Sequence, residues 1–226
     1  MSAMAQAEAP LLLALHSSSE TLAVAICGLA SAGQPQRLDR AAATSAAFPL
    51  GRGLSNALFG CVEQLLPAEQ WPRLARLVVA TGPGGFTGTR LTVVLARTLA
   101  QQLAIPLHGF SSFLLMARRL QAPGAPMQGV ERFWLQQPLP RRGSVAGCYG
   151  PQARAFGGIA ELELPRLWRP DEPLPWPAEP VLEAAVDPLA DVHQLLELGC
   201  LAQADGLAGP WQPVLPLYPT SPVEGL

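Results

Sequence analysis

The sequence predicts an α/β fold with mixed β-sheets, and three observations lead to this prediction. Residues 11–28 read LLLALHSSSETLAVAICG, two apolar β-forming runs on either side of a small polar turn, as in a β-hairpin. Residues 74–120 alternate between strand-like runs and helical spacing, which is typical of helices packed on a sheet. Hydrophobic residues make up 49% of the 226 residues and charged residues only 14%, so the chain can fill a sizeable core.

After the hairpin, the first part of the chain supplies a strand and a helix. We expect a third strand at residues 36–43. Residues 51–66 carry apolar side chains at helical spacing, and Pro67 closes this helix. The apolar stripe consists of Leu54, Leu58, Cys61 and Leu65.

A strand, a glycine-rich loop and a long helix follow one another in the middle of the chain. The strand is predicted at residues 74–80, the loop reads TGPGGFTGTR, and the helix covers residues 91–104. A short strand at residues 107–110 leads into another helix, for which the hydroxyls of Ser111 and Ser112 are suitable N-caps.

The pattern changes after residue 122, where glycine and proline become frequent. A strand pair is predicted at residues 130–137 and 144–150, and one further helix at residues 187–204. Half of the 24 prolines lie from Pro165 onward, so this region is expected to be rich in loops.

These elements predict three parts. Residues 1–9 form a flexible N-terminus, residues 10–108 an N-terminal lobe, and residues 109–226 a reduced, proline-rich C-terminal lobe.

Charge excludes several classes of protein. The formal net charge is -2 and like charges do not form runs, so the chain has no sequence-wide basic surface that would bind nucleic acid without a partner. All 15 cationic residues are arginines, which excludes a P-loop lysine, a Schiff-base lysine and a lysine general base.

Cysteine spacing and hydropathy indicate a cytoplasmic protein. Cys27, Cys61, Cys148 and Cys200 lie far apart without C-x-x-C spacing, so we interpret them as reduced core thiols. No apolar run approaches the ~18 residues that a membrane span needs. Residues 11–15 are too short for a signal peptide and lack a basic flank.

The glycine loop is the main candidate site, and its spacing allows two interpretations. A strand that meets a helix N-terminus favours anions, so the loop could bind phosphate, although neither the P-loop nor the dinucleotide pattern fits. Alternatively, the glycines let this turn pack against the neighbouring hairpin. The candidate loop residues are Gly82, Gly84, Gly85, Thr87, Gly88 and Arg90.

The two helices on either side of this loop lack a fully polar face. Such helices must be covered on several sides, either within an α/β core or by helices of a partner chain. The candidate interface residues are Leu54, Leu58, Phe59, Val62, Leu91, Val94, Leu95, Arg97 and Thr98.

Residues 75–117 resemble the TsaB (YeaZ-like) family, in which G-P-G-S-F-T-G-x-R precedes a small-residue helix, an I-P strand and a helix opened by S-S. The corresponding stretches here read GPGGFTGTR, LTVVLARTLAQQLA, IPLHGF and SSFLLMA. The first hairpin is similar to the family's I-L-A-I-D-T-S-x-x-x-x-V-A-L, RRGSVAGCYG to its A-R-R-x-E-V-Y strand, and PVLPLYPTSP to its closing P-x-Y segment. The chain thus resembles a divergent member of that family.

The resemblance implies an actin-like (ASKHA, RNase H-like) fold with two lobes, mixed sheets and flanking helices. It also implies a homodimer and a complex with the catalytic subunit TsaD and the ATPase TsaE. That complex adds threonylcarbamoyl to N6 of the adenosine beside the anticodon in tRNAs that decode ANN codons. The chain would be a platform whose two helices bundle with TsaD or a second copy. It would reach tRNA indirectly, through the complex, and would not bind a membrane. No cofactor is firmly implied, but weak binding of ATP or ADP is.

The departures from the family concern acidic residues. His16 stands where the family's first strand carries Asp, and imidazole is a poor ligand for a hard metal ion. Gln136, Gln137 and Pro138 stand where the D-A-R-R segment would supply an acid, and Ser144 replaces the usual Glu. We therefore expect no catalytic residue and no metal ligand.

The three histidines do not have the spacing of the paired-histidine metal motif of TsaD-type sequences. We expect His16 to be a turn residue, His108 a strand-end residue and His193 a helix-surface residue. The leading hypothesis is therefore a non-catalytic subunit. The alternatives are a stand-alone actin-like phosphotransferase or glycoprotease-type peptidase, and a dimeric scaffold that is no longer linked to tRNA modification.

Overall fold

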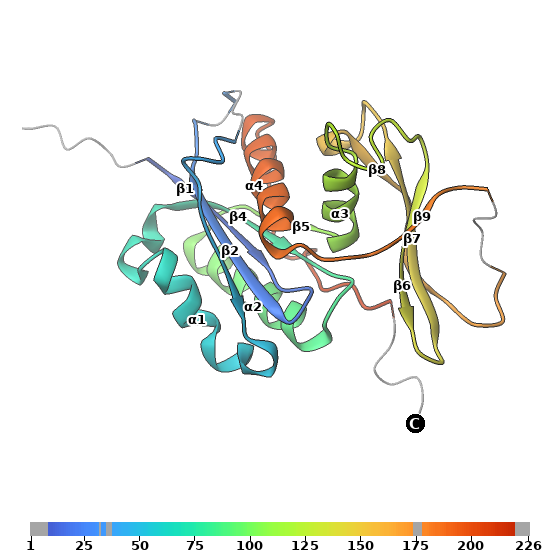
Figure 1. The fold of residues 1–226 in the computed structure, drawn as a ribbon. Helices are drawn as coiled ribbons and strands as arrows, with labels where there is room; N and C mark the ends of the chain where they lie inside the picture. The colour runs from blue at the N-terminus through green and yellow to red at the C-terminus, as the bar shows by residue number, and fades with distance from the viewer. Residues whose placement is uncertain (1–8, 32, 35–37, 174–177, 220–226) are drawn as a thin grey trace, which may run out of the picture.

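The strands form two sheets, one in each of two neighbouring lobes (Figure 1). The computed structural model describes residues 9–31, 33–34, 38–173 and 178–219. In the first sheet the strand order is β3-β2-β1-β4-β5, with the hairpin strands antiparallel and β4 and β5 parallel to β1. Its strands are β1 (Leu11–His16), β2 (Thr21–Gly28), β3 (Thr44–Pro49), β4 (Leu74–Ala80) and β5 (Leu107–Phe110).

Helices cover both faces of this first sheet. Alternate side chains of β1 point to opposite faces, as the two-residue period of a strand requires. Leu13 and Leu15 pack with α1 (Leu54–Leu65) and α2 (Phe86–Leu103). Leu12 and Ala14 pack with α4 (Pro188–Ala204) on the other face. Each fully buried leucine contributes roughly 1.5–3 kcal/mol through the hydrophobic effect, so these two layers hold the lobe together.

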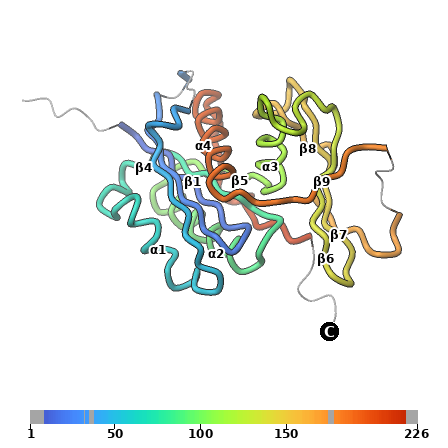
Figure 2. The backbone as a smooth tube through the Cα atoms, in the orientation of Figure 1, coloured from blue at the N-terminus to red at the C-terminus, as the bar shows by residue number. Residues whose placement is uncertain are grey.

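The second sheet has the strand order β8-β7-β6-β9, with only the β6–β9 pair parallel. Its inner face packs on α3 (Ser112–Leu120), and α3 in turn lies against α4, which separates it from the first sheet (Figure 2). Its strands are β6 (Phe133–Leu139), β7 (Gly143–Pro151), β8 (Ile159–Trp168) and β9 (Val181–Glu183). Three 3-10 turns lie at Gly51–Gly53, Ala68–Arg73 and Phe156–Gly158.

These two mixed sheets with flanking helices confirm the predicted α/β fold class. The strands at residues 74–80 and 107–110 have the predicted bounds. The Ser111 side chain caps α3 by accepting from Leu114 N at 3.2 Å, and Asp187 caps α4 in the same way through Ala190 N.

Four elements differ from the prediction, and one of them is β9, where no strand was predicted. The third strand is not at residues 36–43 but at Thr44–Pro49. Asp39 causes the shift, because its side chain accepts from Ala41 N and its carbonyl from Ala42 N and Ala43 N, which closes a turn. Residues 35–37 lie outside the described part of the chain.

Helix α2 begins at Phe86, not at residue 91, so Thr87, Gly88 and Arg90 belong to its first turns. Strand β8 was not predicted at all. It is an edge strand whose sequence, IAELELPRLW, mixes leucines with acids and a proline. This composition is common on exposed sheet edges and hides the apolar pattern of a strand.

Helix α4 follows residue 109 in the sequence but packs on the first sheet, so the later part of the chain contributes to both lobes. The predicted division at residues 108 and 109 stays a prediction, and residues 1–8 of the predicted N-terminal part lie outside the described residues. No helix in the described part of the chain combines the length and apolar character needed to cross a membrane.

Candidate functional site

A cleft of about 940 Å³ lies between the lobes and is the main candidate site. Ser18, Ser19 and Glu20 of the β1–β2 turn form one wall, and Arg52 and Ser55 form another. The first turn of α2 supplies residues 85–88. Gln137 of β6 and residues 185–186 close the cleft from the second lobe.

The glycine loop is packed tightly against the β1–β2 turn. A Cβ on Gly84 would lie 2.6 Å from Ser18 Cα, and a Cβ on Gly88 would lie 2.9 Å from the Ser17 carbonyl oxygen. Gly85 N donates to Ser18 O at 3.0 Å. These positions therefore require glycine for the close approach of two backbones, which is the packing interpretation of the sequence.

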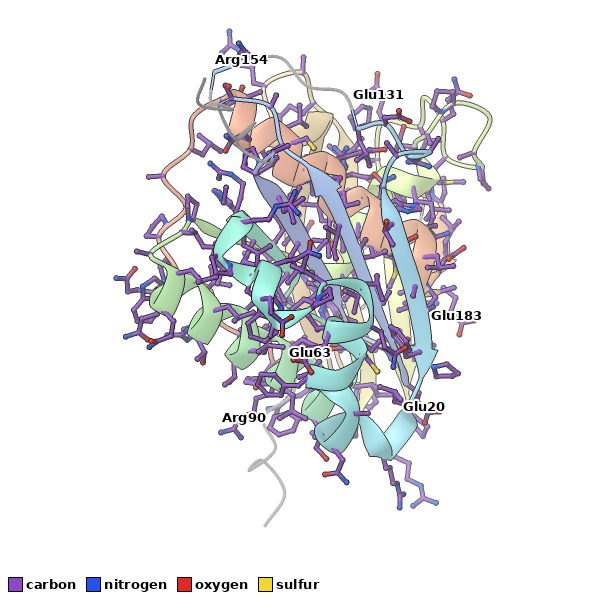
Figure 3. All side chains as sticks on the ribbon, turned by 90° about the vertical axis from the view of Figure 1, so that its left-hand side faces the viewer. Glu20, Glu63, Arg90, Glu131, Arg154 and Glu183 are labelled. Atoms are coloured by element: carbon purple, nitrogen blue, oxygen red, sulfur yellow. The ribbon has the colours of Figure 1, made fainter. Side chains whose placement is uncertain are left out.

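The remaining loop residues are divided between the cleft and other surroundings. Gly85, Thr87 and Gly88 line the cleft. Gly82, with φ +95°, lies instead under the C-terminal segment, where Leu217 N donates to Thr81 O at 2.7 Å. Arg90 is exposed on α2 and points away from the body of the lobe (Figure 3). Only part of the candidate loop could thus contact a ligand in the cleft.

The N-terminus of α2 lines the cleft without a side-chain cap. Its cap residue Gly85 supplies no side-chain hydrogen bond, so within the described structure the first N–H groups of the helix have no side-chain cap. Such groups favour an anion. Binding of phosphate there stays a prediction.

Buried hydroxyl groups hold the cleft's floor together. Ser17 Oγ lies 2.7 Å from Thr92 Oγ1 of α2. Ser18 Oγ is hydrogen-bonded to Ser112 Oγ at the start of α3, and Ser112 N donates to Gly82 O at 2.7 Å. The β1–β2 turn is therefore fixed to both α2 and α3.

His16 ends β1 and is fully buried, so the prediction of a turn residue was wrong. It does not line the cleft but lies near Arg119, which donates from Nε to Asp191 Oδ1 at 2.8 Å. Burial, and secondarily the positive charge of Arg119, lower the pKa of His16 from 6.5 to about 4. The imidazole is therefore neutral at pH 7.

The other two histidines each contact one polar side chain of another element. His108 lies on β5, as expected, with its Nε2 against Arg76 Nη1, and His193 lies on α4 with its Nε2 3.2 Å from Ser45 Oγ. Among the described residues no group of three or more His, Cys, Asp or Glu side chains could hold a metal ion.

The candidate interface residues have two different environments. Four of them are buried in the core of their own lobe, although Leu58 and Leu95 also reach the groove described next: Leu54, Leu58, Val62 and Leu95. Phe59 (56% exposed), Val94 (52% exposed) and Thr98 face solvent, whereas Leu91 and Arg97 are half-buried.

A groove of about 420 Å³ runs along the exposed side of α1 and α2. We call it the α1–α2 groove. It is lined by Phe59, Trp71, Leu91, Val94, Thr98 and Leu103, with Ser55, Leu58, Leu95, Leu99 and Gln102 completing it.

Several residues of the two sites were not anticipated from the sequence. Glu20 and Arg52 reach the cleft only because two turns meet there. Trp71 reaches the groove because its ring stacks 6.5 Å from Phe59. Tyr218 lies 4.8 Å from Phe86 at the cleft, a contact across most of the chain length. Sequence periodicity contains no signal for such long-range contacts.

Comparisons with known proteins find sequence similarity over part of the chain and similarity of fold over nearly all of it. A family model described as TsaD, tRNA N6-adenosine threonylcarbamoyltransferase, matches residues 51–128, which include α1, α2 and the glycine loop. The tRNA threonylcarbamoyladenosine biosynthesis protein TsaB of Bacillus subtilis (strain 168) is 50% identical over 44 residues, 20% of this chain. The matched segment spans 19% of the length of that curated relative.

Two solved structures from Pseudomonas aeruginosa share the fold across nearly the whole chain. A protein with similarity to peptidase YEAZ is 22% identical, with a TM-score of 0.68 over 93% of this chain and 100% of its own. YeaZ itself is 23% identical, with a TM-score of 0.66 over 92% of this chain and 99% of its own. Taken together with the local TsaB and TsaD matches, these similarities identify the chain as a TsaB/YeaZ-like protein.

Proposed function

We propose that this chain is a non-catalytic platform subunit in the cytoplasmic machinery that adds threonylcarbamoyl to N6 of the adenosine next to the anticodon in ANN-decoding tRNAs. It acts with the catalytic subunit TsaD and the ATPase TsaE. The observation that carries the proposal is the exposed α1–α2 groove within residues 51–128, the part of the chain that is similar to TsaD.

The groove has the chemistry of a protein interface. Phe59 and Val94 are large apolar side chains exposed side by side with Trp71, and aromatic residues of this kind are enriched where two proteins meet. The remaining lining residues are mostly aliphatic, so a partner helix could lie in the groove without burying an unpaired charge.

TsaD is the occupant we propose for this groove. Because this chain resembles TsaD-type proteins over the segment that forms the groove, the two subunits present similar helix pairs. Similar surfaces can pair about a two-fold or pseudo-two-fold axis. The same argument predicts that the chain forms a homodimer through this groove when TsaD is absent.

The cleft is proposed to bind nucleotide weakly rather than to catalyse. The uncapped N-terminus of α2 supports binding of an ATP or ADP phosphate. The position of His16 supports the non-catalytic role, because a fully buried neutral imidazole outside the cleft lining replaces the acid expected on β1. This subunit would meet tRNA only as part of the assembled complex.

The proposal is tested by mixing the purified chain with TsaD from the same cell and measuring the mass of the complex by light scattering, with and without nucleotide and TsaE. A stable complex that contains both subunits is expected, and the chain alone should measure as a dimer. Lack of association under all of these conditions would overturn the platform role.

A groove variant makes the test specific. Phe59→Glu combined with Val94→Glu places two charges in the groove, and loss of anchors of this kind weakens binding by roughly 100-fold or more. Both side chains are more than half exposed, so the fold should survive. Leu164→Glu is the matched control, because Leu164 is 70% exposed on β8, far from the groove, and this change should leave TsaD binding intact.

A further inference from the structure

Four arginines gather at one end of the second sheet. Arg141 and Arg142 form the β6–β7 turn, which is closed by Arg142 N donating to Leu139 O at 3.0 Å. Arg166 and Arg169 lie at the end of β8, next to the turn, because β7 pairs Ser144 with Trp168. We call this group the arginine tip. It is at the lower end of the second sheet in Figure 1.

The four arginines of the tip have different surroundings. Arg166 Nη1 lies 3.3 Å from Glu172 Oε2, and the Arg166 guanidinium also lies over the Trp168 ring. The same carboxylate accepts from Arg169 N at 2.9 Å. The Arg141 and Arg142 side chains are exposed and form no ion pair with any residue in the described ranges.

A hollow of about 370 Å³ opens between these side chains. Arg141 and Arg169 line it, Ser144 adds a hydroxyl group, and the Glu172 carboxylate that pairs with Arg166 belongs to the same lining. Guanidinium groups present planar pairs of N–H donors that match the oxygens of a phosphate. The hollow therefore offers charge and hydrogen bonds suited to a phosphate group.

The backbone at the turn adds a second observation. Arg141 has φ +63°, in the left-handed region that residues other than glycine rarely adopt. Glycine would avoid this strain. An arginine there places a charged side chain at the tip at some cost in stability, and backbone strain of this kind is common at functional positions.

We propose that the arginine tip binds phosphate groups of an RNA backbone within the complex, as a direct contact between this subunit and the tRNA. The inference rests on the proposed function, which brings tRNA to the complex. An RNA backbone suits the tip better than a single anion, because the cations are spread over a turn and a neighbouring strand end. Such contacts would orient the tRNA without reading its sequence.

The test is fluorescence anisotropy of labelled tRNA with the complex of this chain, TsaD and TsaE, over a range of salt concentrations. Arg141→Gly with Arg142→Ala removes two charges, and glycine suits the backbone at position 141. Binding is expected to weaken about tenfold at low salt, and the slope of log affinity against log salt should fall by about 1 per arginine. Arg154→Ala is the control, because this exposed arginine lies at the opposite end of the second sheet (Figure 3).

The outcomes separate the two proposals. If the double variant still assembles with TsaD but binds tRNA with unchanged affinity and salt slope, the arginine tip is not an RNA contact and the platform role stands. An equal loss in Arg154→Ala would also overturn the inference, because only net charge would then matter. If the unaltered chain fails to join TsaD, the proposed function is wrong. The arginine tip is then tested by measuring binding of tRNA to the chain alone at low salt. Unchanged binding by the double variant in that measurement would refute the arginine tip as an RNA contact.

Discussion

Replacement of Gly84 by alanine is expected to lower the free energy of unfolding by about 3 kcal/mol, because the new methyl group enters space already filled by the β1–β2 turn. Its Cβ would lie 2.5 Å from Ser18 Cβ and 2.6 Å from Ser18 Cα. Ser18 cannot move aside easily, since Gly85 N donates to its carbonyl and its hydroxyl is bonded to Ser112. For a chain of this size the melting temperature should fall by roughly 6–12 °C.

Gly85→Ala is the matched control for this change. A Cβ on Gly85 meets nothing closer than Ser19 O at 4.0 Å. The only expected cost is that alanine is a poorer N-cap residue than glycine, which lowers the free energy of unfolding by at most about 1 kcal/mol. Urea unfolding of both variants measures the difference. Equal destabilisation would mean that the loop does not depend on this close packing.

The same pair of variants separates the two roles of the loop. Gly85 lines the cleft, whereas Gly84 is pressed against Ser18. If the loop binds the phosphate of ADP, Gly85→Ala should weaken nucleotide binding in a protein of nearly normal stability. The packing role and the ligand role thus belong to adjacent residues and can be measured independently.

The sequence predicts those elements whose apolar pattern is continuous. The strand at residues 74–80 and the helix at residues 187–204 lie almost entirely where periodicity places them, because β4 is an inner strand of the first sheet and α4 packs on that sheet. Strand β8 escapes prediction because its leucines alternate with acids at a sheet edge, where Leu164 stays 70% exposed. A half-exposed edge strand carries too weak a pattern to be recognised.

The candidate site is only partly predictable for a different reason. The glycine loop is a local motif, and its contact with the first hairpin follows from the order of the elements. The wall formed by Gln137 and residues 185–186 depends on how the lobes meet, which no local pattern encodes. Likewise, helical periodicity indicates that Leu58 and Phe59 belong to one helix but not that Trp71 would join Phe59 in a groove.

Stability should decline steeply on mild acidification, and His16 is one of two expected causes, because the pKa of His108 is lowered to about 4 as well. Its pKa is about 4 in the folded protein against 6.5 for an ordinary histidine, because the ring is fully buried and near Arg119. Between these values the unfolded chain binds the proton and the folded protein does not. The contribution of His16 to the free energy of unfolding is therefore fully present above pH 6.5. It falls by about 3 kcal/mol as the pH drops to 4.

The surroundings of His16 explain why no partner offsets this loss. Neither ring nitrogen has a hydrogen-bond partner among the described residues. Arg119 of α3 repels the proton, and Asp191 of α4, which could attract it, already accepts from Arg119 Nε at 2.8 Å. Burial raises the pKa of Asp191, so this carboxyl opposes the acid effect slightly rather than causing it.

His16→Leu isolates this contribution, because leucine fills a similar volume and cannot bind a proton. His108, whose pKa is also lowered to about 4 by burial and by Arg76, keeps its own contribution, so urea unfolding at pH 7 and at pH 4.5 should show about half of the pH dependence removed. The variant should be at least as stable as the parent at pH 7, since a buried polar group without a partner is lost. His193→Gln is the control, because that ring is only partly buried and bonded to Ser45, so its removal should leave most of the pH dependence. A parent protein equally stable at both pH values would show that His16 is not buried as a neutral ring.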